Sequence, residues 1–482
     1  MRKDLVEERL KKLSKLKVAG INPYPIEAKR NLEISAARKD FSRISKSKKN
    51  ISLVGRIFSI RDQGGVIFCT LKDETGSIQA VFKKETSKNF KLFKDTLDRG
   101  DFISVTGPLF QTKKGEESIE VRVAQILTKS IKPLPTEWFG LEETETRLRR
   151  RYLDFLMNPE TKAIFRKKDI FWNTFRNEMK AAGFLEVETP VFESVPGGAD
   201  AEPFKTRHNA LDTDFFLRIS LELPLKKLLV GGFEKVFEIG RIFRNEGIDR
   251  EHLQDYTQLE FYWAYKDYND GMKFVEKLYK TVIKKTVGTL VTTYQGKKIN
   301  WGKKWPKVYF VKEFIKANKI DPIIATKEEL FKKANDLGLK PEKGLGKGRL
   351  IDLIYKKTIR PHLLEPCFLI NPPVEVVPLA KRSEKNPNLV ERFHPIACGT
   401  ELGTGYSELN DPIDQRKRFE EQMKLRAAGD KEAQMLDEDF LEALEYGMPP
   451  ATGFGVSERL FSVILDKPVR ETVIFPLVRP KR

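Results

Sequence analysis

The most informative stretch of the chain is FEIGRIFRNEGIDREHLQDYTQLEFYWAYKDY, Phe237 to Tyr268, which reads as two strands joined by a polar loop. Side chains alternate across a strand, so the first strand, ending FRNE, is predicted to place Arg244 and Glu246 on one face. The returning strand, TQLEFYWAY, places Glu260 and Tyr262 on a common face in the same way. The pattern predicts a base, acids and a phenol side by side, which is typical of a nucleotide site.

A surface hairpin with ordinary ion pairs is the alternative, because most charged strand residues have that explanation. A second group of this kind, GFGVSERLF at residues 453–461, lies near the C-terminus. Two such groups in one chain favour a functional site over a solvated hairpin.

Composition indicates an enzyme with more than one domain. The chain has 482 residues, of which 40% are hydrophobic, enough for two or three domains. Subtracting 69 acidic from 88 basic residues gives a formal charge of +19, which favours a polyanionic partner such as nucleic acid; adaptation for solubility is the alternative. No run of about twenty apolar residues occurs, so we expect a soluble protein without a membrane partner. Cys69, Cys367 and Cys398 are odd in number and lack metal-ligand spacing, which fits a reducing cytoplasm.

The pattern of charged and apolar residues divides the chain into three regions. Residues 1–50 combine a basic amphipathic helix over residues 3–18 with a cationic segment that is either a solvated linker or a phosphate-contacting arm. Residues 51–135 carry five short alternating strands, which predict a small antiparallel barrel. The run KSIKPLPTEWFG reads as a linker, and residues 141–482 mix helices and strands as in an α+β catalytic domain.

The barrel carries candidate contacts for single-stranded nucleic acid. Arg61, Phe68 and Gln79 are expected on its exposed face, with Glu116 in the loop before the last strand. An aromatic platform beside polar side chains is how OB-folds bind unpaired bases. A place in the barrel core is the alternative for Phe68.

Three segments resemble the signature motifs of class II aminoacyl-tRNA synthetases. GFLEVETP after a helix resembles motif 1, FRNEG with its loop and QLEFYWAY resembles motif 2, and GFGVSERLF resembles motif 3, in the usual order. The strings PGGADAEPF, GGFEKVFEIGRIFRNEGID and GDKEAQMLDEDFLEALEYGMPP narrow the resemblance to bacterial-type lysyl-tRNA synthetases, over nearly the whole chain.

The resemblance implies an N-terminal anticodon-binding OB-fold followed by an antiparallel-sheet catalytic domain that forms a homodimer through motif 1. It implies ligation of L-lysine to tRNA(Lys) with ATP as co-substrate, Mg²⁺ as cofactor and a lysyl-adenylate intermediate. In this reaction two anions, a carboxylate and the α-phosphate, must approach each other, and a forked cation suits that task.

By the resemblance, that cation is Arg244, with Arg459 as the second catalytic arginine. The same comparison places Tyr256 and Arg459 on the two sides of adenine, Glu246 near its amine and His252 near the phosphates, and makes Glu401 a magnesium ligand.

Lysine recognition is also carried over from the resemblance. Glu408 and Tyr262 are expected to hold the ε-ammonium, and Glu222 with the backbone of Gly198 the α-amine. Glu260 completes the acidic pocket, while Arg244 and Thr404 are expected near the carboxylate. Strand alternation in GTGYSELND independently places Thr404, Tyr406 and Glu408 on one face, so that Tyr406 can pack along the aliphatic stem.

Several positions depart from the family pattern. His394 stands where a second magnesium-binding glutamate is usual, and Thr404 where asparagine is usual. The motif 2 loop has Leu253, Gln254 and Asp255 in place of Asn, Pro and Glu, and a shortened motif 3 carries Glu458 beside Arg459. His394 and Leu253 keep one alternative open, a lapsed synthetase that only binds tRNA. A second alternative is a lysyl transferase that modifies a protein, although such relatives usually lack the barrel that this chain has. Aspartyl and asparaginyl synthetases share the architecture, but the acidic pocket argues for a cationic substrate.

Overall fold

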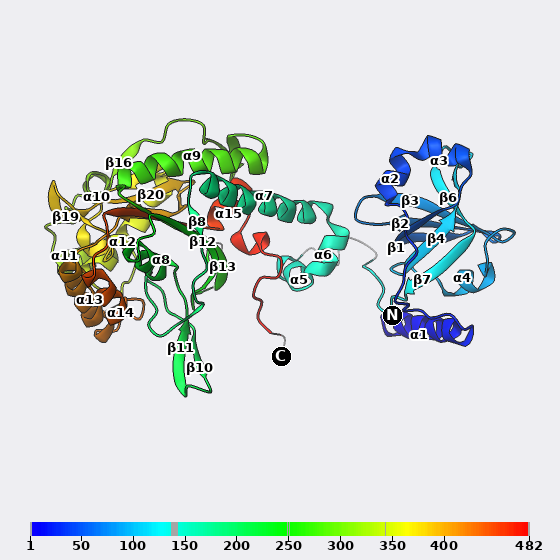
Figure 1. Ribbon diagram of the computed structural model, residues 1–482, viewed down its shortest axis with the longest axis horizontal. Coiled ribbons are helices and arrows are strands. Elements are labelled where there is room, and N and C mark those ends of the chain that lie inside the picture. The colour runs from blue at the N-terminus through cyan, green and yellow to red at the C-terminus, as the bar shows by residue number, and fades with distance from the viewer. Residues whose placement is uncertain (1, 136–142, 248, 250, 343, 481–482) are drawn as a thin grey trace. The chain divides into compact units, whose positions relative to one another are not determined.

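The computed structural model of the chain (Figure 1) describes residues 2–135, 143–247, 249, 251–342 and 344–480. The chain forms two compact units, Met1–Glu143 and Thr144–Arg482. Residues 136–140 of the expected linker and residue 141, the expected start of the catalytic domain, lie outside the described residues.

The first unit is built on a seven-stranded sheet in the order β5-β6-β3-β2-β1-β4-β7. Two of the five expected strands are each divided in two, at Pro108 and at Arg122. Pro108 has no N–H to give to a ladder. All pairs are antiparallel except β3 with β6. The strands are β1 (Ile51–Asp62), β2 (Val66–Lys72), β3 (Ser77–Lys83), β4 (Phe102–Gly107), β5 (Leu109–Gln111), β6 (Glu117–Val121) and β7 (Val123–Thr128), with the helix α4 (Phe90–Thr96).

Three helices precede the barrel: α1 (Arg2–Val18), α2 (Ile34–Lys39) and α3 (Phe41–Ser47). The structure excludes a solvated linker for residues 34–47, whereas the phosphate-contacting arm stays a prediction. Ile34, Ala37, Phe41 and Ile44 are buried and belong to the same apolar cluster as the barrel strands. Burial of these four side chains makes residues 34–47 part of the barrel unit.

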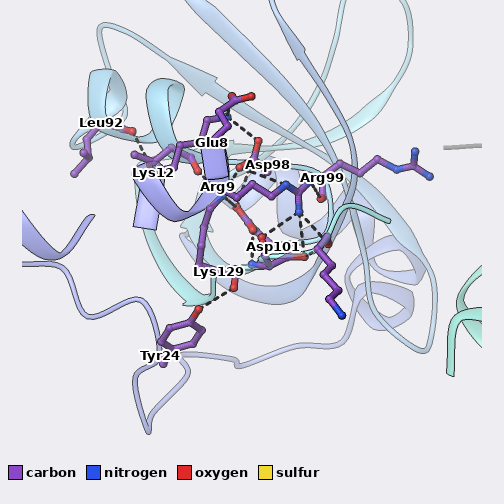
Figure 2. A network of polar contacts seen from close by, with 12 residues as sticks. Glu8, Arg9, Lys12, Tyr24, Leu92, Asp98, Arg99, Asp101 and Lys129 are labelled. Atoms are coloured by element: carbon purple, nitrogen blue, oxygen red, sulfur yellow. Dashed lines mark hydrogen bonds and ion pairs between the residues drawn. The ribbon is translucent and has the colours of Figure 1, made fainter. Parts of the chain in front are cut away.

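A polar network fixes α1 to the barrel (Figure 2). Arg9, which is buried, donates from Nη2 to the carbonyl of Arg99 (2.8 Å) and from Nη1 to that of Ser130 (3.0 Å). Lys12 pairs with Asp98 (2.8 Å), which also accepts from the fully buried Lys129 (2.5 Å). Part of the positive charge of α1 is therefore committed to the barrel.

The second unit is built on a nine-stranded sheet with the path β16-β17-β20-β22-β23-β13-β12-β8, while β21 pairs with β20. Its pairs are antiparallel except β8 with β12 and β16 with β17. The strands are β8 (Leu185–Glu186), β12 (Lys235–Phe243), β13 (Asp255–Ala264), β16 (Lys307–Tyr309), β17 (Cys367–Ile370), β20 (Arg392–Ala397), β21 (Thr400–Glu401), β22 (Thr404–Ser407) and β23 (Ala451–Ser457).

Smaller elements complete this unit. The short strands are β9 (Phe192–Glu193), β10 (Lys205–His208), β11 (Thr213–Leu217), β14 (Val291–Tyr294), β15 (Lys297–Asn300), β18 (Arg382–Ser383) and β19 (Asn386–Val390). The helices are α5 (Thr144–Arg149), α6 (Arg151–Met157), α7 (Pro159–Ala181), α8 (Glu222–Val230), α9 (Tyr268–Val287), α10 (Phe310–Asn318), α11 (Lys327–Asp336), α12 (Lys347–Thr358), α13 (Pro412–Ala427), α14 (Glu438–Glu445) and α15 (Arg459–Ile464). None of the helices in the described residues is long and apolar enough to cross a membrane.

The two faces of the large sheet have different roles. Phe261, Phe393 and Phe454 point into a core that also contains the apolar stripes of α7 and α9. Gly183, with φ +82°, follows α7, and its left-handed backbone suits the end of a helix. Alternation sends the neighbouring residues Glu260 and Tyr262 to the opposite face. That face carries α8 and α14 and the candidate site.

Candidate active site

A cavity of about 670 Å³ opens on the face of the sheet opposite α7 and α9. Every residue that the sequence analysis assigned to ATP or lysine lines it: Gly198, Glu222, Arg244, Glu246, His252, Tyr256, Glu260, Tyr262, Glu401, Thr404, Tyr406, Glu408 and Arg459. The lining comes from strands β13, β22 and β23, helix α8 and the loop after β12. The structure therefore brings the whole predicted set together in one place.

The hairpin differs from its prediction in one respect: β12 ends at Phe243, so Arg244 and Glu246 lie in the loop. The amide of Arg244 still donates to the carbonyl of Gln254 (2.8 Å), but that of Asn245 donates to Glu202 (2.8 Å). The backbone leaves the ladder to pair with another segment, and strand alternation no longer governs these two side chains.

Glu260 is the most firmly held carboxylate of the cavity. Its Oε1 accepts from Ser220 (2.7 Å) and from the side-chain amide of Gln258 (2.6 Å), and its Oε2 accepts from the Tyr262 hydroxyl (3.0 Å). Burial, reinforced by the charge of Glu222, raises the pKa of Glu260 above its ordinary value, although these donors oppose the shift. The expected sharing of one face by Glu260 and Tyr262 is confirmed.

Glu222 and Glu408 share a cation from the chain itself. The ammonium of Lys226, which is fully buried, lies 2.6 Å from Glu222 Oε1 and 2.5 Å from Glu408 Oε2. Glu222 also accepts the Tyr406 hydroxyl at 2.5 Å. Neither carboxylate oxygen of Glu408 has a hydrogen-bond partner of good geometry among the described residues. Glu408 is the carboxylate with most capacity left for a ligand.

Burial dominates the acid–base behaviour of this end of the cavity. It raises the pKa of Glu408 well above the ordinary range, in opposition to the charge of Lys226. Burial would lower the pKa of Lys226, but the carboxylates of Glu222 and Glu408 raise it instead. Burial and the neighbouring carboxylates also raise the pKa of Tyr262 and Tyr406 well above 10, so both phenols stay protonated donors.

Glycines make room for this acidic end. A Cβ on Gly453 would lie 2.3 Å from Glu408 Oε1 and 2.4 Å from the Tyr262 ring. Gly198 has φ +81°, and a Cβ there would lie 2.8 Å from the Cβ of Glu222. The backbone at both positions approaches side chains that line the cavity, and any larger residue would displace them.

Arg244 has a free guanidinium fork. Its Nε donates to the carbonyl of Ile219 (3.1 Å), and its guanidinium carbon lies 5.8 Å from the centre of the Tyr256 ring. In the described part of the chain, its two terminal nitrogens meet no hydrogen-bond acceptor. Burial opposes the charge, but Tyr256, Glu246 and Glu260 raise the pKa of Arg244. The arginine is a fixed cation with donors left for a ligand.

Glu401 lies among cations. Burial alone would raise its pKa, but the charges of Lys356, Arg392 and Arg360, beside the imidazole of His394, hold the pKa of Glu401 below its ordinary value. Arg459 approaches from a third side and donates to the carbonyl of Glu401 (3.4 Å). These residues all line the cavity, together with Asp352 and Glu251, which pair with Lys356 and Arg360, so this end gathers four cations around Glu401.

His394, one of the departures from the family pattern, is a neutral imidazole at physiological pH. Burial, with the nearby charge of Arg392, lowers its pKa to about 3. Its Nδ1 lies 2.9 Å from the carbonyl of Gly403 and must donate to it, so Nε2 carries the lone pair.

The altered motif 2 loop has internal supports. The Gln254 side chain donates to the carbonyls of Glu246 (3.3 Å) and Gly247 (3.0 Å). His252 Nδ1 lies 2.6 Å from the Asp249 carboxylate. Leu253 is buried and lines the cavity, while Asp255 pairs with Arg241.

Glu458, in the shortened motif 3, accepts from the Thr257 amide (3.2 Å) and pairs with Lys168 of α7 (2.8 Å). The substituted positions of motifs 2 and 3 thus have structural partners.

Sequence reasoning missed most of the cations in and behind the cavity: Lys226, Lys356, Arg360 and Arg392. For two of these cations, the sequence contains a spacing that could have predicted their place near the site. Lys226 follows Glu222 by one helical turn, the spacing of an ion pair, and Arg392 precedes His394 by two residues on one strand face. Lys356 lies in α12 and Arg360 follows that helix, and no sequence motif pointed to either residue.

The candidate nucleic-acid contacts of the barrel unit also lie on one face. Arg61 on β1 pairs in register with Phe68 on β2, and Gln79 on β3 lies beside Thr70, two residues along β2. Gln79 accepts from Ser118 of β6 (3.1 Å), and Glu116 precedes that strand. Phe68 is half-buried on the outer face, opposite the core residues Ile67 and Cys69, so a place in the core is excluded.

Comparison with known proteins agrees with this arrangement. The family of tRNA synthetases class II (D, K and N) matches residues 143–479, and the OB-fold nucleic acid binding domain matches residues 51–128. The chain is therefore a class II aminoacyl-tRNA synthetase with an OB-fold domain.

Its curated relatives include the lysine–tRNA ligases of Moorella thermoacetica (44% identical), Carboxydothermus hydrogenoformans (43%) and Thermotoga maritima (41%). The first two alignments cover 99% of this chain and 98% of the relative, and the third covers 100% and 97%. The chain belongs to the lysine–tRNA ligase family.

Proposed function

We propose that this protein activates L-lysine with ATP and transfers the lysyl group to the terminal ribose of tRNA(Lys). The observation that carries the proposal is the polarity of one cavity, with Glu222, Glu260 and Glu408 at one end and cations at the other. An acidic end suits the two ammonium groups of lysine, and a basic end suits a triphosphate.

Lysine orientation follows from the remaining hydrogen-bonding capacity. Glu408, whose Oε2 pairs with Lys226 while its Oε1 has no hydrogen-bond partner among the described residues, accepts the ε-ammonium, helped by the Tyr262 hydroxyl. Glu222 and the backbone at Gly198 accept the α-amine. A neutral or acidic side chain would leave the buried carboxylate of Glu408 without its partner, which rejects such amino acids.

Arg244 lies where the carboxylate of lysine and the α-phosphate must meet, beside Tyr256 and within the field of Glu260. Its free fork binds both anions and offsets their repulsion as the carboxylate attacks phosphorus in line and pyrophosphate leaves. The adenine base stacks between Tyr256 and Arg459, with Glu246 at its amine and His252 at the phosphates. In the second step a ribose hydroxyl of tRNA attacks the carbonyl of the adenylate.

Glu401 fits a magnesium ion shared with the nucleotide. Its low pKa keeps the carboxylate ionised, and Mg²⁺ uses one or two carboxylates together with phosphate oxygens. The described residues contain no cluster of three or more His, Cys, Asp or Glu side chains suited to a metal, so phosphates and water supply the remaining ligands. The ion neutralises triphosphate charge when bound.

The barrel face with Arg61, Phe68, Gln79 and Glu116 is proposed to bind the anticodon. We also propose a homodimer through the motif 1 region, where Ile170, Leu185 and Phe192 are exposed apolar residues. The three cysteines are buried free thiols, which supports a reducing cytoplasm as the location.

Lysine-dependent ATP–pyrophosphate exchange tests the first step, and charging of tRNA(Lys) tests the second. The absence of both activities in the purified protein would refute the proposal. Binding of tRNA without formation of lysyl-adenylate would instead support the lapsed synthetase. Lysylation of an elongation factor in preference to tRNA would select the protein-modifying transferase. Sedimentation of wild type and Leu185→Lys tests the dimer, which the lysine is expected to weaken.

A further inference from the structure

Lys226 is a buried charge that substrate contacts do not account for. Its side chain is fully buried and does not line the cavity, yet its ammonium contacts two carboxylates that do, Glu222 at 2.6 Å and Glu408 at 2.5 Å. It also lies over the Tyr406 ring, 5.4 Å from the centre, and near Phe440 of α14 at 6.0 Å. Lys226 thus acts from behind the wall of the amino-acid pocket.

The charges at this end can be counted from the groups that face one another. Glu222 comes from α8, Glu260 and the phenol Tyr262 from β13, and Glu408 with the phenol Tyr406 from β22 and the residue after it. Three carboxylates and the one ammonium of Lys226 give a formal charge of −2. The α- and ε-ammonium groups of lysine carry +2, and its carboxylate is matched by Arg244.

We propose that Lys226 is a positioning residue that sets the charge of the amino-acid pocket to match a dication and holds Glu222 and Glu408 ionised and in place. This inference rests on the proposed lysine-activating function. Without Lys226, the three carboxylates would exceed the ammonium groups of lysine by one buried charge. The pocket would then take up a proton, and the protonated carboxyl would lose its ion pair with the substrate.

The acid–base properties of the site support this sequence of events. Burial already raises the pKa of Glu408, and the charge of Lys226 is the largest influence that lowers it. Removal of Lys226 therefore moves the protonation of this end of the pocket to higher pH.

The test is Lys226→Met, which keeps the length of the side chain and removes its charge. At pH 7 the KM for lysine in ATP–pyrophosphate exchange is expected to rise roughly 10- to 100-fold, because a buried pair has lost one partner. Between pH 6 and 8.5 the KM of Lys226→Met for lysine should fall as the pH rises, by up to about tenfold per pH unit, because lysine binding to this variant releases a proton. The KM of the wild type should change less over the same range. The kcat at saturating lysine should change little, since Lys226 touches no reacting group.

Two further variants separate charge from packing. Lys226→Arg keeps the charge and is expected to restore the flat pH profile, even if its bulk raises KM. Lys227→Met removes the next lysine of α8, which pairs with Asp439 outside the pocket, and is expected to leave KM and its pH profile unchanged. An equal, pH-independent rise of KM in Lys226→Met and Lys226→Arg would reduce Lys226 to a packing residue, and an unchanged KM in Lys226→Met would overturn the proposal.

Wild-type protein gives a second test that does not depend on the folding of a variant. Calorimetric titration with lysine in buffers of different ionisation enthalpy counts the protons exchanged on binding. At pH 7.5 we expect fewer than about half a proton per lysine, because on this proposal the Lys226 ammonium, 2.6 Å from Glu222 and 2.5 Å from Glu408, keeps both carboxylates ionised before lysine binds. Release of a full proton would overturn the proposal, whereas absence of lysine-dependent exchange in the wild type would refute the proposed function instead.

Discussion

Arg244 meets a single protein acceptor among the described residues, the carbonyl of Ile219, which fixes the base of the guanidinium and leaves its fork for the two reacting anions. Arg244→Ala is therefore expected to lower the kcat of lysine-dependent exchange by roughly 10²- to 10³-fold, the usual effect of removing one donor from a developing charge. Arg241→Ala is the matched control, because Arg241 pairs with Asp255 and does not line the cavity. A defect confined to KM, with normal turnover at saturation, would contradict a role in the transition state.

Gly453 offers a graded test of the lysine pocket. A methyl group at this position would collide with Glu408 Oε1 and Tyr262, so Gly453→Ala should raise the KM for lysine by roughly 5- to 150-fold, equivalent to about 1–3 kcal/mol of overpacking. Gly455→Ala, on the same strand and face, would meet atoms only at 3.3 Å and should have a smaller effect. Equal effects of the two substitutions on exchange kinetics would indicate damage to β23 instead of the pocket.

At the scale of single residues, the sequence predicted the cavity side chains that belong to short motifs. It missed most of the charged side chains that lie behind or beside them. Glu408 and Tyr262 lie in motif-like strings, and the structure places both in the cavity. Lys226 acts on Glu408, and Arg360 acts on Glu401, from elements whose positions only the fold establishes. A buried lysine on an otherwise apolar helix is readable from the sequence, but its partner across the pocket is not.

At the scale of elements, α1 is held by the polar network of Figure 2 together with Leu16, which is buried in the barrel core, while Leu5 and Leu10 are exposed. Arg9→Ala removes donors from the carbonyls of Arg99, Ser130 and Lys132, and should lower the free energy of local opening of α1 by about 1–3 kcal/mol. Hydrogen exchange of α1 in the full chain measures this, with the exposed Lys11→Ala as control. Unchanged protection in Arg9→Ala would show that other contacts hold the helix.

Some helices and strands end at a local sequence signal. Others end where a contact with a distant segment intervenes, and such an end cannot be read from the local sequence. α7 ends at a local signal, Gly183, whose left-handed backbone is a conformation that glycine adopts readily. β12 ended before Arg244, because Asn245 pairs with Glu202 far away in the chain. Residues 34–47 looked like a cationic link, since their four buried apolar side chains are spread thinly among charged ones.

At the scale of the whole molecule, the chain has one unit whose outer face is proposed to bind single-stranded nucleic acid and another whose cavity is proposed to bind lysine and ATP. Phe68→Ala should weaken tRNA binding by roughly 5- to 150-fold, equivalent to about 1–3 kcal/mol of lost base stacking, while lysine-dependent exchange without tRNA stays at the wild-type level. Phe68→Leu keeps apolar bulk against the barrel but removes the ring, so it should share the tRNA defect. Wild-type tRNA affinity in Phe68→Leu, with loss only in Phe68→Ala, would show that Phe68 supports the barrel and does not stack on a base.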